Sequence, residues 1–136
     1  MISEHETAEK RRIRALMTDK LPAPKGSYSQ AVRAGDFIFI SGIVGVEPKT
    51  GAVSSDVYTQ MGQVLTNMRT LIEEAGGAMS DVVKTTVFLA DMQDYAALNE
   101  IYAHYFPEIL PARSTVAAKP PADFLVEIEA VAYLPE

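Results

Sequence analysis

Four polar side chains near the C-terminal end of the sequence have the types that bind and convert small carboxylic acids. Arg113, Ser114 and Thr115 follow directly after Pro111-Ala112, and Glu127 lies in the next strand-like segment. The planar guanidinium group of an arginine binds a carboxylate through two charge-assisted hydrogen bonds, and a nearby carboxyl group can orient water or transfer a proton. Spacing alone leaves open the alternative that Arg113 is a surface cation and Glu127 a solvated strand residue.

Other common catalytic and cofactor-binding motifs are missing from the sequence. It contains no cysteine, so disulfides, thiolate metal sites and cysteine nucleophiles are excluded. His5 and His104 are the only histidines, and they are too isolated for a metal cluster or a Ser-His-acid triad. Gly76-Gly77 lacks the Lys-Ser/Thr pair of a phosphate-binding loop. We therefore expect no metal and no organic cofactor.

The length and charge of the chain indicate one acidic domain. A chain of 136 residues that is 48% hydrophobic can bury one core but is too short for two independent ones. The formal net charge of -6 opposes nucleic-acid binding, which depends on clustered Lys and Arg. No apolar run approaches the ~20 residues that span a bilayer, and the N-terminus does not resemble a secretory signal. We therefore predict a cytoplasmic protein with neither a membrane nor a nucleic acid as its partner.

The first 24 residues differ in composition from the rest of the chain. They mix charges of both signs and end in Leu21-Pro22-Ala23-Pro24, which interrupts any helix. Their basic residues before this segment include Lys10, Arg11, Arg12 and Arg14. Acidic neighbours dilute this basic cluster, so we predict a solvated arm rather than a contact for RNA or a membrane. We expect residues 1–24 to form a flexible or partly helical extension and residues 25–136 to form the domain.

Periodic patterns in the domain predict strands and helices in a definite order. The strand-like runs are residues 28–34, 37–41, 82–90, 113–118 and 125–133. Gly35-Asp36 suits a hairpin turn between the first two runs. Apolar residues recur at helical spacing over residues 57–75, with Asp56 as the N-cap, and a second helix is expected to begin at Asp94 and end at Pro107. The predicted order is β-β-α-β-α-β-β.

This order predicts a mixed sheet with one uncovered face. Strand-helix-strand units normally have right-handed crossover connections, so both helices can lie on the same face of the sheet. Along the last predicted strand, Val126 and Ile128 alternate with Glu127, yet Val131 and Tyr133 also lie on the Glu127 side. Both faces are therefore partly apolar, and self-association is the economical way to cover the second one.

A series of short motifs runs in register along about residues 22 to 134. They are Gly26-Ser27-Tyr28-Ser29-Gln30-Ala31, Ser41-Gly42, Pro48-Lys49-Thr50-Gly51, Asp81-Val82-Val83-Lys84-Thr85-Thr86-Val87-Phe88, Asn99 with Tyr102, Pro111-Ala112-Arg113-Ser114 and Val126-Glu127-Ile128-Glu129-Ala130-Val131-Ala132. In this order and spacing, the sequence resembles the RidA/YjgF family, also called endoribonuclease L-PSP-like proteins. The resemblance implies an α+β, chorismate-mutase-like fold and a homotrimer with its sites in the clefts between subunits.

The resemblance also implies an activity and a set of site residues. The family hydrolyses reactive enamines and imines, such as 2-aminoacrylate and its imine, to 2-oxo acids and ammonia without a cofactor. By position in the sequence, Arg113 is expected to bind the substrate carboxylate, with Asn99 and Gly42 in supporting substrate-binding roles. The catalytic positions carried over in the same way are Tyr28, Glu127 and Thr115. The expected partners are thus a small carboxylated imine or enamine and two further copies of the chain.

Several positions around this implied site depart from the family pattern. Ser27 stands where the family often has Pro, Ile43 and Gly45 replace Gln and Pro, and Thr115 replaces a common Cys. Lys119-Pro120-Pro121 replaces a more usual Arg-Leu-Pro stretch. We therefore also consider a related imine or enamine as the substrate.

Two alternative functions stay open at this stage. One is an endoribonuclease or translation inhibitor, against which the acidic net charge argues. The other is a noncatalytic trimer in which Arg113 captures a carboxylated metabolite.

Overall fold

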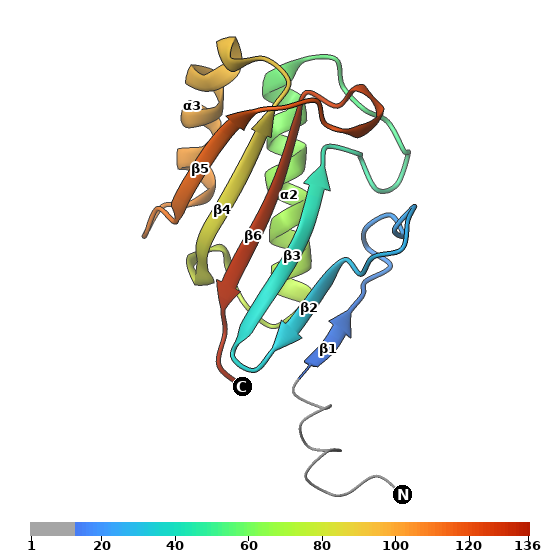
Figure 1. Ribbon diagram of the computed structural model, residues 1–136, viewed down its shortest axis with the longest axis vertical. Helices are drawn as coiled ribbons and strands as arrows, with labels where there is room; N and C mark the ends of the chain where they lie inside the picture. Colours follow the sequence, from blue (N-terminus) through green and yellow to red (C-terminus); the bar gives the residue numbers. More distant parts are fainter. Residues whose placement is uncertain (1–12) are drawn as a thin grey trace, which may run out of the picture.

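The computed structural model describes residues 13–136, which form a six-stranded mixed sheet and two α-helices (Figure 1). The strands are β1 (Ile13–Leu16), β2 (Ala31–Ala34), β3 (Phe37–Val44), β4 (Val82–Leu89), β5 (Ala112–Ala117) and β6 (Val126–Tyr133), and the helices are α2 (Val57–Glu74) and α3 (Tyr95–Tyr105). The sheet order is β1-β2-β3-β6-β4-β5, in which β4 and β5 run parallel and all other neighbours run antiparallel. None of the described helices is long and apolar enough to cross a membrane.

Strand β1 is an element that the sequence patterns did not predict. The described part of the expected N-terminal extension is not helical at Ile13–Leu16 but pairs antiparallel with β2, so that Ile13 lies opposite Ala34 and Leu16 opposite Ala31. A strand of four residues is too short to show alternation in a sequence, and its conformation is set by pairing with β2. The basic residues Lys10, Arg11 and Arg12, and the rest of residues 1–12, lie outside the described residues.

The main helix and the hairpin are confirmed. Asp56 caps α2, because its Oδ2 accepts a hydrogen bond from the Thr59 amide at 2.9 Å. Gly76 follows the helix with a φ of 93°, and Gly35 in the hairpin turn has a φ of 60°, a conformation that favours glycine. The expected strand from residue 28 is shorter, however, because β2 begins only at Ala31.

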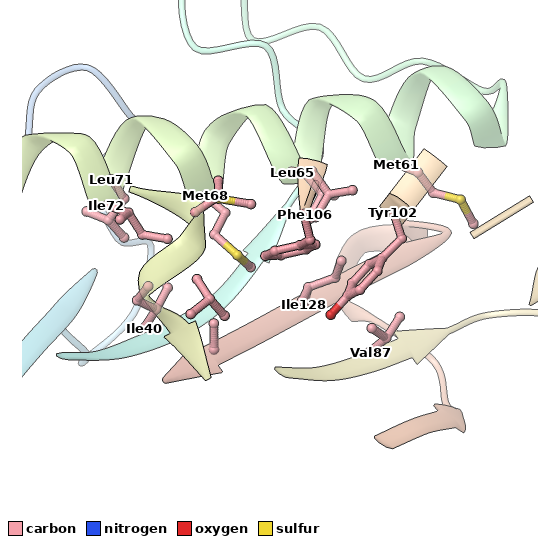
Figure 2. Packing of buried hydrophobic residues seen from close by; sticks show 14 of the residues in the cluster. Ile40, Met61, Leu65, Met68, Leu71, Ile72, Val87, Tyr102, Phe106 and Ile128 are labelled. Carbon is pink, nitrogen blue, oxygen red and sulfur yellow. The ribbon is translucent and has the colours of Figure 1, made fainter. Parts of the chain in front are cut away.

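The core lies between the sheet and the two helices. Met68, Leu65 and Ile72 of α2 pack over the buried side chains of Ile40 and Ile128 (Figure 2). The expected inward set of β6 is confirmed. Its members are Val126, Ile128, Ala130 and Ala132, and all of them are buried. Burial of this apolar surface is the main contribution to the stability of the fold.

The opposite face of the sheet remains uncovered within residues 13–136. Phe37 and Phe39 on β3 and Tyr133 on β6 are each more than two-fifths exposed, and the rings of Phe37 and Tyr133 contact one another with centroids 5.3 Å apart. Val116 on β5 adds to the exposed apolar surface. An apolar sheet face of this kind is typical of an interface.

Candidate functional site

The predicted site residues form two separate groups on a single chain. Tyr28, Gly42 and Glu127 line one cavity of about 290 Å³. Asn99 and Arg113 line a second, shallower depression beside α3. Thr115 lines neither of them. The chain therefore carries two separate groups of candidate residues, which we name the Glu127 half-site and the Arg113 half-site.

The first half-site is a mostly apolar cavity with one carboxyl group. Its walls include Leu21, Ile43, Leu71 and Phe124, and among the described residues Glu127 is the only acidic one that lines it. Burial raises the pKa of the Glu127 carboxyl above its ordinary value, and the negative charge of the nearby Glu129 raises it further. A carboxyl group with a raised pKa in an apolar wall is suited to exchanging protons with water.

Gly42 makes room for the carboxyl group of Glu127. The pairing of β3 with β6 shifts its register between Ile40 and Ile43, so the strand bulges at Ser41-Gly42. A Cβ atom at Gly42 would lie 2.7 Å from Cδ and 2.8 Å from Oε2 of Glu127. Glycine is therefore the residue that lets the carboxyl group rest against the backbone of β3.

If the imine hydrolysis that the family resemblance implies takes place at Glu127, the Gly42→Ala variant should fold normally but lose that activity. The added methyl group must displace the flexible end of Glu127, so we expect kcat to fall at least about tenfold with little change in stability. Gly62→Ala is a matched control, because a Cβ there would approach nothing nearer than the Tyr105 hydroxyl at 3.8 Å. Turnover by the purified variants and thermal unfolding are the measurements. An unchanged kcat in Gly42→Ala would contradict the role assigned to this contact.

The second half-site holds Arg113 in a fixed position against α3. Its Nη2 donates hydrogen bonds to Asn99 Oδ1 at 2.7 Å and to the Tyr95 hydroxyl at 3.2 Å. Its guanidinium carbon lies 4.9 Å from the centre of the Tyr102 ring and 5.5 Å from that of Tyr95. Stacking and hydrogen bonding of this kind immobilise the guanidinium plane before any ligand arrives. Arg113 is thus prepared for the planar recognition of a carboxylate.

Sequence reasoning did not assign Tyr95 and Tyr102 to the site. Tyr102 is buried, with its hydroxyl 2.7 Å from the Thr85 hydroxyl. Burial raises the pKa of Tyr102, which keeps its phenol neutral beneath Arg113. Tyr95 and Tyr102 lie on the same side of the helix as Asn99, and this spacing was the available signal. Only the fold shows that the Arg113 side chain of β5 contacts this side of α3.

Arg113 and Glu127 lie on opposite faces of the sheet. Arg113 pairs with Thr85 of β4, whose side chain points to the helix side and bonds Tyr102. Glu127 pairs with Phe88, three residues further along β4, and paired residues share a face. An odd separation along a strand reverses the face, so the two side chains cannot meet within one chain.

Thr115, one of the catalytic positions carried over from the family, has a buried hydroxyl group. Its Oγ1 is buried and has no hydrogen-bond partner among the described residues. It pairs with Val87, on the helix side of the sheet. Within residues 13–136, no group of three or more His, Cys, Asp or Glu side chains is placed to hold a metal ion.

Comparison with known proteins identifies the class of protein that carries these half-sites. A sequence model of the family described as Endoribonuclease L-PSP matches residues 18–134. The chain therefore belongs to this family, the RidA/YjgF family, and the resemblance noted from the motifs is confirmed.

Particular relatives match over nearly the whole chain. A RutC family protein of Pyrococcus horikoshii is 48% identical over 120 residues, which are 87% of this chain and 95% of the relative. A protein of Salmonella typhimurium named 2-iminobutanoate/2-iminopropanoate deaminase is 43% identical over 123 residues, 88% of this chain and 96% of its own length. The chain is thus similar to relatives that carry the name of an enzyme.

Solved structures of the family have the same fold. RidA from an Antarctic Psychrobacter is 40% identical and superposes with a TM-score of 0.86 over 89% of this chain and 99% of its own. TdcF from E. coli, solved with bound serine, is 35% identical and superposes with a TM-score of 0.84 over 88% of this chain and 98% of its own. These structures confirm the expected arrangement of a mixed sheet with two helices.

Proposed function

We propose that this protein hydrolyses 2-imino acids, formed from enamines such as 2-aminoacrylate, to 2-oxo acids and ammonia. The observation that carries the proposal is the pair of half-sites: an immobilised Arg113 beside Asn99, and a Glu127 of raised pKa in an apolar cavity. The deaminase name of the Salmonella relative supports it. One half-site suits the carboxylate of such a substrate and the other suits its reacting end.

In the proposed reaction, a water molecule adds to the carbon of the protonated imine. Arg113 holds the carboxylate, so the imine carbon is presented in a fixed position to a water molecule beside Glu127. The Glu127 carboxylate takes a proton from this water as the C–O bond forms, and returns a proton to the nitrogen. The C–N bond then breaks with its electron pair going to nitrogen, while the Glu127 carboxylate takes the hydroxyl proton as the C=O bond forms. The ammonia receives this proton and leaves as ammonium, and the 2-oxo acid follows. Hydrolysis of an iminium ion is intrinsically easy, so the chemistry needs neither a metal nor an organic cofactor.

We further propose that the protein is a homotrimer whose sites lie between subunits. Arg113 and Glu127 lie on opposite sheet faces, so only a neighbouring chain can complete each half-site. The uncovered face with Phe37, Phe39 and Tyr133 supplies apolar surface for such an assembly. Closed rings of identical subunits use the same pair of surfaces at every interface.

The assembly should be visible in solution. We expect multi-angle light scattering at micromolar concentration to give three times the mass of the 14.8 kDa chain, because burying the apolar sheet face is favourable. A persistent monomer would contradict both the assembly and the intersubunit site.

Mixing two impaired variants should restore activity if each site takes Arg113 from one chain and Glu127 from another. In trimers that assemble at random from equal amounts of Arg113→Ala and Glu127→Gln chains, about one quarter of the sites combine both native residues. At substrate concentrations well below KM, co-expressed chains should therefore reach about a quarter of wild-type activity, while each variant alone stays at about a tenth or less. No recovery in mixed trimers, verified by mass spectrometry of the assembly, would place both residues of a site on the same chain.

A coupled assay tests the proposed function itself. A dehydratase generates 2-aminoacrylate, and the disappearance of 2-aminoacrylate is followed with and without this protein. The assay is run in two buffers, one that contains a chelator and one that does not. We expect acceleration over the spontaneous hydrolysis in either buffer. Binding of 2-oxobutanoate without acceleration would favour the noncatalytic carboxylate-binding trimer instead, and cleavage of RNA by the same preparation would favour the endoribonuclease.

A further inference from the structure

Helix α2 carries two polar residues on the side that faces the core. Gln60 and Asn67 are each 2% exposed, although their neighbours on the same side include Met61, Val64 and Met68. Seven residues separate them, which is about two helical turns, so both point from one face of the helix. A carboxamide buried in an apolar core is costly unless its hydrogen bonds are made, so their partners explain their presence.

Gln60 binds the chain immediately before Glu127. Its Oε1 accepts hydrogen bonds from the main-chain amides of Leu125 at 2.6 Å and Val126 at 3.3 Å. Its Nε2 donates to the carbonyl of Ser54 at 2.8 Å. The carboxamide therefore connects the start of β6 to the loop that precedes α2.

Asn67 binds the strand on the other side of Glu127. Its Nδ2 donates to the carbonyls of Val44 at 3.1 Å and Val46 at 2.9 Å. Val44 is the residue of β3 that pairs with Glu127 across the sheet. The two carboxamides of α2 thus hold the main chain of both β6 and β3 at the position of this carboxyl group.

A glycine directly after β3 permits the close contact with α2. A Cβ atom at Gly45 would lie 2.6 Å from the carbonyl oxygen of Gln60 and 2.8 Å from its Cγ. The backbone after β3 therefore rests directly on the Gln60 residue. The absence of a side chain at Gly45 thus brings the chain after β3 against Gln60, as its absence at Gly42 lets Glu127 rest against β3.

We propose that Gln60 is a positioning residue for Glu127, acting through the amides of Leu125 and Val126, with Asn67 holding the opposite strand. The inference rests on the proposed function and extends it to a residue that does not line the cavity. A general base must be held within hydrogen-bond reach of the water that it activates, so a looser start of β6 lowers the frequency of productive geometry. Arg113 lies on the other sheet face, and its ligand binding does not depend on this contact.

The test compares three variants. Gln60→Met keeps the size of the side chain but removes all its hydrogen bonds, whereas Gln60→Glu keeps an oxygen that accepts from Leu125 and Val126. Ile72→Val, at a fully buried position of the same helix, is a control for a general loss of stability. The measurements are kcat and KM in the coupled assay, binding of 2-oxobutanoate by calorimetry, and hydrogen exchange of the peptide that contains Leu125 and Val126.

We expect Gln60→Met to lower kcat at least about tenfold, to change the 2-oxobutanoate Kd less than about twofold, and to speed exchange at Leu125 and Val126. Gln60→Glu should recover most of kcat, and Ile72→Val should resemble the wild type. A kcat for Gln60→Met equal to that of Ile72→Val would overturn the inference, as would an equal loss of turnover and binding.

Two further results keep the proposal testable. If Gln60→Met fails to assemble, Asn67→Asp must lower kcat without weakening 2-oxobutanoate binding, and wild-type turnover by that variant would overturn the inference. If the wild type itself fails to accelerate imine hydrolysis, the proposed function is wrong. The exchange rates of Leu125 and Val126 in Gln60→Met then decide separately whether Gln60 holds this segment, and unchanged rates would overturn that part.

Discussion

Replacing Arg113 by alanine should weaken the binding of 2-oxobutanoate at least about tenfold. Each charge-assisted hydrogen bond lost is worth roughly 1.5–3 kcal/mol, and about 1.4 kcal/mol corresponds to a factor of ten in Kd. Within residues 13–136, the described hydrogen bonds of this side chain to Asn99 and Tyr95 both use Nη2, so the hydrogens of Nη1 are available to a carboxylate. Isothermal titration of the folded assembly is the measurement.

Lysine at this position should restore binding only in part. Its ammonium group keeps the charge but lacks the planar pair of donors and the stacking over Tyr102. Arg69→Ala is a suitable control, because Arg69 stacks over Tyr105 at 5.2 Å and lines neither cavity. If Arg113→Ala binds and turns over like the wild type, the carboxylate site lies elsewhere.

Replacing Glu127 by glutamine should leave product binding nearly intact and lower kcat by roughly 10²–10⁴-fold. The amide keeps the shape of the side chain beside Gly42 but does not accept a proton from water. Rates from the coupled assay, after subtraction of spontaneous hydrolysis, should separate this variant from Arg113→Ala, whose defect is in binding. Retained turnover in Glu127→Gln would show that another group activates the water.

The same variant has an expected signature in the pH profile. Burial and Glu129 raise the pKa of Glu127, so its reactive carboxylate form is lost, as pH falls, at a higher pH than for an ordinary glutamate. The wild-type activity should show this acidic limb, and Glu127→Gln should lack it. Glu129→Gln is the control, because removing its negative charge lowers the pKa of Glu127 and moves the limb to lower pH. A limb that persists in Glu127→Gln would assign it to the substrate or to another residue.

The variants of Arg113 and Glu127 test two residues whose chemical types could be read from the sequence. The relative position of the two side chains could not be read from it. Arginine and glutamate in adjacent strand-like runs indicated a carboxylate site with a water-handling group. Within one chain, the two side chains do not meet. Strand β4 lies between β5 and β6, and the pairing registers place the two side chains on opposite faces. Pairing registers depend on contacts between distant segments, which no local pattern records.

Secondary structure that depends on contacts between residues near in sequence was predictable from the sequence alone. The periodicity of residues 57–75 and the cap at Asp56 predicted α2 closely, because helix contacts join residues three or four positions apart. The ordered motifs likewise identified the family, since they extend over most of the chain.

The construction of the half-sites depends on the tertiary structure, because their contacts join segments that are far apart in the sequence. Arg113 stacks on Tyr95 and Tyr102. Gly42 contacts Glu127, and Gln60 accepts a hydrogen bond from the start of β6. Strand β1 forms for a similar reason, because its partner β2 supplies the hydrogen bonds that four residues cannot make alone. The sequence gives the type of each side chain. Which residues that side chain contacts depends on strand register, bulges and helix packing, and these are properties of the whole fold.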